Sequence, residues 1–75
     1  MIRYEVPAAA DVSAKVYSLS GQLVRALLHR EVEAGYHAVQ WDGMDERGNA
    51  TAAGVYLYQV VAGRDRLTGK MLLLK

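Results

Sequence analysis

A polar loop from Asp42 to Asn49 carries the residue types that come nearest to binding a metal ion. Clustered carboxylate and carbonyl oxygens are the ligands that Ca²⁺ prefers. An EF-hand loop beginning at Asp42 would place oxygen ligands at its third and fifth positions and a bidentate Glu at its twelfth. Counted from Asp42, the sequence has Met44 at the third loop position and Ala53 at the twelfth. Because the spacing does not match, we expect no metal ligand here.

A turn-forming role explains the same loop better. Asp side chains readily accept hydrogen bonds from backbone N–H groups a few residues further along the chain. We therefore expect Asp42 and Asp45 to accept such bonds, and Gly43 and Gly48 to adopt backbone angles that other residues avoid. These four residues are predicted to be structural, and calcium binding is the alternative.

The other candidates for catalysis are two histidines and three serines. A catalytic zinc site usually takes three protein ligands, often in a pattern such as H-E-x-x-H, and neither histidine lies in one. No G-x-S-x-G nucleophile elbow occurs. The sequence therefore predicts a protein that is not an enzyme and has no catalytic or cofactor-binding residue. The residues considered are His29, His37, Ser13, Ser18 and Ser20.

Aromatic side chains suggest a different chemistry, the stacking of sugar rings on a flat aromatic surface. A small sandwich also needs large side chains to fill its core, and Tyr hydroxyl groups can reach the rim for hydrogen bonds. We expect core packing, with Trp41 as the largest core side chain and Tyr56 also a core residue, and carbohydrate binding as an alternative. The residues concerned are Tyr17, Tyr36, Trp41, Tyr56 and Tyr58.

The composition limits both the fold and the partners. The 75 residues form one domain (residues 1–75), and with 52% hydrophobic residues and no cysteine it must be stabilised by an apolar core. The net charge is +1 and the basic residues are dispersed, which argues against a nucleic-acid partner. No apolar run is long enough for membrane insertion and no signal peptide is recognisable, so we expect any export signal to lie outside this chain.

Short segments in which apolar and polar residues alternate recur along the chain, and this period of two is typical of half-buried strands. Turns containing Gly21, Gly35 and Gly54 separate several of them. Several short strands with frequent turns predict a β-sandwich. The expected strands are Ile2–Val6, Val12–Tyr17, Tyr36–Trp41, Val55–Ala62 and Leu67–Leu74.

The segment Gln22–Val32 is ambiguous, because Leu23, Leu27 and Leu28 fit i, i+4 helical spacing and Ala26–Glu31 are good helix formers. Pattern alone leaves helix and strand open. In the next strand, His37, Val39 and Trp41 share one face. Val55–Ala62 is apolar on both faces and is predicted to be a central strand covered on two sides.

Five motifs follow one another in a characteristic order: Val16–Val24, Ala34–Gly43, Asp45–Gly48, Ala53–Tyr58 and Thr68–Lys75. In this order they resemble the Ig-like domain of the flagellar hook-capping protein family. They are equally similar to the C-terminal sorting domains of type IX secretion substrates. The resemblance covers the chain from about Ile2 to Lys75.

The resemblance implies an all-β, Ig-like (fibronectin-type-like) antiparallel sandwich of about seven short strands without catalysis, and it favours a strand for Gln22–Val32. The leading hypothesis is a C-terminal module for secretion sorting or cell-surface anchoring of a larger exported bacterial protein, located outside the cell or on its surface. The alternatives are a structural assembly domain of a hook-capping protein and a carbohydrate-binding accessory module.

The last strand predicts a partner surface. If Met71 and Leu73 face the core, alternation turns Leu72 and Leu74 outward. Exposed leucines beside lysines can mark a protein contact, and the free strand edge can accept another strand. We expect the secretion machinery or a neighbouring domain of the parent chain to bind here. The candidate residues are Lys70, Leu72, Leu74 and Lys75.

Overall fold

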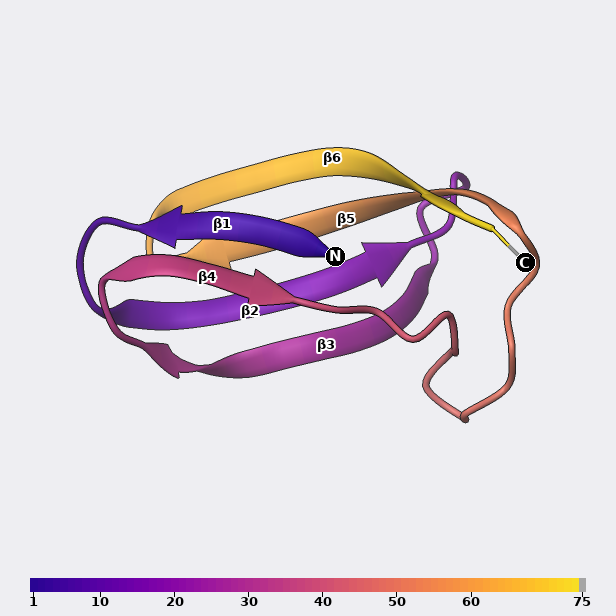
Figure 1. Ribbon diagram of the computed structural model, residues 1–75, viewed down its shortest axis with the longest axis horizontal. Helices are drawn as coiled ribbons and strands as arrows, with labels where there is room; N and C mark the ends of the chain where they lie inside the picture. The colour runs from indigo at the N-terminus through magenta and orange to yellow at the C-terminus, as the bar shows by residue number, and fades with distance from the viewer. Residues whose placement is uncertain (75) are drawn as a thin grey trace.

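The computed structural model describes residues 1–74, which form six antiparallel β-strands. Their bounds are β1 Ile2–Val6, β2 Ala10–Tyr17, β3 Leu23–Val32, β4 Gly35–Val39, β5 Gly54–Ala62 and β6 Asp65–Leu73. The larger sheet has the order β3-β2-β5-β6, and β1 pairs with β4 in a smaller sheet that lies in front of it in Figure 1. The described residues contain no helix that could cross a membrane. The predicted all-β sandwich is confirmed, with six strands where about seven were expected.

The core lies between the two sheets and is built from alternate residues of their strands. In β2, Val12, Ala14 and Val16 are completely buried, whereas the residues between them are at least partly exposed. This is the alternation that a strand with one buried face requires. The buried cluster consists of Ile2, Tyr4, Val6, Val12, Ala14, Val32 and Val60.

The ambiguous segment is a strand, because β3 pairs with β2 along its whole length. Ala14 lies opposite Leu28 and the next residue of β2 lies opposite Ala26, so Leu27 is the extra residue of a β-bulge. Leu27 and Leu28 both pack against the core. The bulge therefore brings two consecutive leucines to the same interior, whereas Leu23, at helical spacing from Leu27, is 50% exposed.

Two expectations about the core were wrong. β5 is central in its sheet, but none of the described residues forms a layer over its outer face, where Val55 is 42% exposed. Trp41 is only partly buried and lies outside the core cluster. The physical reason is that β4 ends at Val39, so Trp41 already belongs to the following loop, where its ring meets Tyr56 edge-on at a centroid distance of 4.9 Å.

Glycines occupy the tight turns of the fold. Gly63 is the first of two residues between β5 and β6 and has a φ of 59°, as the first position of a type II′ hairpin turn requires. The five glycines singled out from the sequence also have positive φ values: Gly21, Gly35, Gly43, Gly48 and Gly54.

One further glycine lies inside a strand and has a packing role. Gly69 of β6 is paired with Tyr58 of β5, and the aromatic ring of Tyr58 lies over it. A Cβ atom at position 69 would overlap the Tyr58 ring. The absence of a side chain at Gly69 therefore determines where this ring packs.

We predict that Gly69→Ala lowers the free energy of unfolding by about 1–3 kcal/mol, because overpacking forces the Tyr58 ring from its position. Urea unfolding followed by circular dichroism measures this. Thr68→Ala, on the opposite face of β6, is the control and should stay close to the parent. Equal stability of Gly69→Ala and the parent would contradict the predicted overlap.

Candidate functional site

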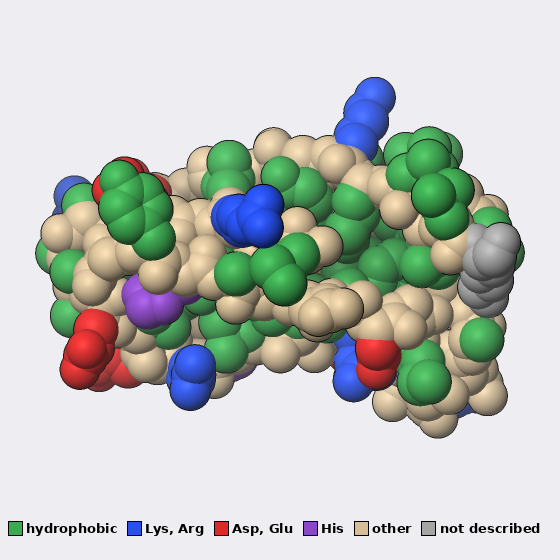
Figure 2. Space-filling view, in the orientation of Figure 1, with side chains coloured by type: hydrophobic (Ala, Val, Ile, Leu, Met, Phe, Trp, Pro, Cys, Tyr) green, Lys and Arg blue, Asp and Glu red, His purple; other side chains and the backbone are tan. Residues whose placement is uncertain are grey.

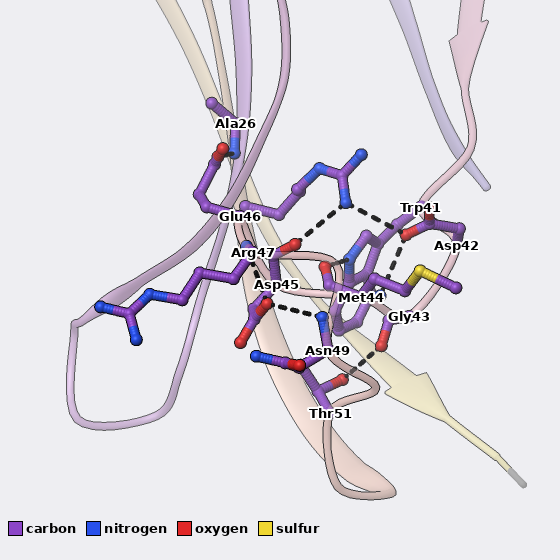
Figure 3. A network of polar contacts seen from close by, with 11 residues as sticks. Ala26, Trp41, Asp42, Gly43, Met44, Asp45, Glu46, Arg47, Asn49 and Thr51 are labelled. Carbon is purple, nitrogen blue, oxygen red and sulfur yellow. Dashed lines mark hydrogen bonds and ion pairs between the residues drawn. The ribbon is translucent and has the colours of Figure 1, made fainter.

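The polar loop Asp42–Asn49 lies between β4 and β5 and is called the acidic loop below. Its own backbone N–H groups donate hydrogen bonds to its Asp side chains (Figure 3). The Oδ1 atom of Asp42 accepts a hydrogen bond from the Met44 N–H at 3.0 Å. The Oδ1 atom of Asp45 accepts from the N–H groups of Arg47 at 2.9 Å and Asn49 at 3.0 Å. These are the side-chain-to-backbone bonds that the turn interpretation expects of the two carboxylates.

The same loop binds the edge strand β3. The N–H of Glu46 donates to the Val24 carbonyl at 3.1 Å, and the Glu46 carboxylate accepts a hydrogen bond from the Ala26 N–H. Edge strands expose backbone groups that can pair with other chains, and covering them suppresses such pairing. Glu46 therefore acts in place of a neighbouring strand at this end of β3.

Further donors occupy the oxygen atoms of the loop. Arg25 donates to the Asp45 carbonyl at 3.1 Å, and its guanidinium lies 3.6 Å from the Asp42 carboxylate. The Gly43 carbonyl accepts both the N–H of Thr51, at 2.9 Å, and its hydroxyl, at 2.8 Å. Within residues 1–74 no three His, Cys, Asp or Glu side chains are grouped so that they could hold a metal ion. The loop atoms are engaged in contacts that stabilise the fold.

The two histidines lie in different sheets and have different surroundings. The Nε2 atom of His37 donates to the Glu33 carbonyl at 2.7 Å, and its ring stacks on Tyr4 at a centroid distance of 5.6 Å. His29 is exposed on β3, where it is paired with Ser13. No hydrogen bond between a serine and a histidine occurs in the described part of the chain. The contacts of His37 are those of a histidine at the rim of the core.

The aromatic side chains do not share one face. Tyr17 lies on the outer face of the larger sheet, and Tyr36 is 85% exposed on the smaller sheet. Trp41 and Tyr56 form an edge-on pair, and Tyr58 packs against the core. The structure therefore does not bring the five rings together as a flat platform.

The outer face of the larger sheet carries a continuous apolar area at one end. Leu72 of β6 pairs with Val55 of β5, and Tyr17 of β2 pairs with both Leu57 of β5 and Leu23 of β3. Val55 and Leu57 are two residues apart on one strand and share a face. Leu72 is 61% exposed, Leu23 is 50% exposed and Val55 is 42% exposed. We call these five residues the outer-face patch.

Part of this patch was predicted from the last strand. Leu72 belongs to it, Lys70 lies opposite Leu57 at its border, and Leu74 is 77% exposed just beyond the end of β6. Lys75 lies outside the described residues. The other members of the patch were missed, because cross-strand register brings them together. A signal did exist in the sequence, since β5 is apolar on the face that points away from the core.

The fold defines a class, that of small Ig-like β-sandwich domains. The chain belongs to a family within that class, since a family model described as the FlgD Ig-like domain matches residues 1–66. This family is structural and non-catalytic. No curated protein and no solved structure matches the chain significantly. The hook-capping part of the resemblance is thus confirmed, and no comparison connects the chain with type IX sorting domains.

The hydrogen bonds of the acidic loop also affect its titration. The hydrogen bond from the Asn49 N–H is the main cause that lowers the pKa of Asp45 below its ordinary value, and the Arg47 N–H adds to it. Desolvation acts in the opposite direction. The charged carboxylate is therefore bound better by the folded loop than the protonated form is.

This shift predicts a pH dependence of stability. The contribution of Asp45 is present above its unfolded-state pKa of about 3.9 and is lost as the pH falls through its lowered folded-state pKa. We expect Asp45→Asn to remove this contribution, so that its urea midpoint falls less than that of the parent between about pH 6 and pH 2. Asp11→Asn, at an exposed position near the start of β2, is the control and should follow the parent. An equal fall for Asp45→Asn and the parent would contradict the assignment.

Proposed function

We propose that this chain is a structural assembly domain of a flagellar hook-capping protein and that it contacts neighbouring subunits through the outer-face patch. The family match over residues 1–66 carries this proposal. In this role the domain is one module of a larger exported protein and acts outside the cell. It contributes binding surface and no catalysis.

The composition of the outer-face patch supports a protein contact. Protein interfaces have an apolar centre, often with aromatic residues, surrounded by a polar rim. Tyr17 and Leu57 lie at the middle of the patch, and Lys70 borders it on β6. Beyond them the same face becomes polar, with Lys15, Gln59 and Thr68 in one cross-strand row. This arrangement is typical of an apolar contact with a charged border.

The choice of assembly over secretion sorting depends on the family match. Both functions would use an exposed apolar surface, including Leu72 and Leu74, so the surface alone does not distinguish them. The match favours assembly. Carbohydrate binding has less support, because the aromatic rings lie on separate faces.

The test introduces two charges into the patch of the parent protein. We expect Val55→Lys with Leu72→Lys to reduce the number of assembled hooks, counted by electron microscopy, at least about tenfold, because burying charges in an apolar contact costs several kcal/mol. Motility should fall with it. Because Val55 and Leu72 are a cross-strand pair, the two lysines repel each other and the purified domain should lose up to about 1 kcal/mol of stability while it stays folded.

Thr68→Lys is the matched control, since it adds a charge to the same face of β6 outside the patch and should leave hook assembly unchanged. Normal hooks in the double variant would show that the patch is not the contact. Normal hooks after deletion of the whole domain would overturn the assembly function itself.

A further inference from the structure

The two layers of the sandwich differ in width and length. The smaller sheet has two strands of five residues, whereas the larger has four strands, of which β5 and β6 each contain nine. Neighbouring strands lie about 4.8 Å apart, so the larger sheet is wider by roughly 10 Å. In Figure 1, β6 runs along the top of the view, beyond the free edge of β1. The structure therefore has a step between β1 and β6.

The floor of this step is apolar. An open groove there has Tyr4 of β1, Val60 and Ala62 of β5 and Leu67 of β6 on its floor, and the charged residues Glu5, Asp65 and Arg66 also line it. Leu67 faces the same side as Val60, its partner in the sheet, yet remains 41% exposed. Figure 2 shows further hydrophobic side chains in a hollow to the right of the N-terminal end of β1. Inward-facing apolar residues of the larger sheet thus lack a complete covering layer.

The wall of the step is an open strand edge. Among residues 1–74, β1 pairs with β4 only, so its other edge presents backbone N–H and C=O groups to the step. Such groups form a template for another strand. The edge of β3 differs, because Glu46 hydrogen-bonds to it. The unpaired backbone edge of β1 therefore lies beside the apolar floor, and no described strand pairs with that edge.

We propose that the step binds one extended strand of a partner polypeptide, which pairs with the free edge of β1. Every second residue of this strand has a small apolar side chain that points toward the floor of the step, which includes Leu67. A helix is about 10–12 Å wide and has no free backbone groups with which to satisfy the β1 edge. A second copy does not fit edge to edge, because β6 projects beyond β1 and the two projecting strands would collide. A single extended strand can form backbone hydrogen bonds with the β1 edge and also cover the apolar floor.

This site lies on the opposite side of the larger sheet from the outer-face patch, so it does not depend on the proposed assembly contact. The probe is a synthetic nine-residue peptide with valine at alternate positions and threonine or lysine between them. We expect the peptide to slow amide hydrogen exchange in β1 at least about tenfold at saturation, since paired N–H groups are protected. The same peptide N-methylated at alternate amides cannot pair and should give no protection.

Two substitutions in β6, one on each face of the strand, show on which face of the larger sheet the peptide binds. Leu67→Lys places a charge on the floor of the step and should weaken peptide binding at least tenfold in a fluorescence titration. Leu72→Lys carries the same change on the opposite face of β6 and should bind like the parent. Circular dichroism checks that both are folded, and the N-methylated peptide tests pairing without any variant.

Three results would overturn the proposal. The first is unchanged exchange in β1 with the peptide. The second is loss of binding in Leu72→Lys but not in Leu67→Lys, which would place the peptide on the outer-face patch. The third is a dimer of the free protein in sedimentation that itself protects β1, which would make a second copy the occupant.

Discussion

Burial of one face of β2 is the constraint on which the rest of the structure depends. Val12, Ala14 and Val16 are completely buried, and β2 is paired on both sides, with β3 and β5. A shift of one residue in either pairing would turn this apolar row to solvent. The register of β2 therefore determines which residues of β3 and β5 face the core, and through β5 it also determines the faces of β6.

The unequal layers follow from how that core is closed. The two short strands of the smaller sheet supply Ile2, Tyr4 and Val6 and cover the middle of the larger sheet. At one end the acidic loop continues the cover, where Gly43 approaches Leu73 closely enough that a Cβ atom would lie 3.3 Å from it. The loop is thus part of the fold, and its carboxylates are used in its own hydrogen bonds.

Two surfaces of the fold carry exposed apolar area. The outer face of the larger sheet ends in an apolar patch, and the inner face of β6 extends beyond β1. The first exists because the outward-facing positions at that end of the sheet are apolar, and the second because the short smaller sheet does not reach over β6. Exposed apolar area of this kind can mark a contact with other chains, and it is the observation on which the proposed contacts rest.

The sequence by itself determined the strands whose pattern is local. The strands β1, β2, β4 and β6 are recognisable from a period of two, because that period needs only the strand's own geometry, and β5 is recognisable as a short apolar run between glycines. The outward position of Leu72 and the turn roles of Asp42 and Asp45 were also predictable, since they depend on close neighbours in the chain. Tertiary structure alone decided the rest. The bulge at Leu27, the partly exposed position of Trp41 and the union of Tyr17, Leu57 and Val55 in one patch depend on register and on the extent of the covering layer. These are contacts between residues distant in sequence, and no local pattern specifies them.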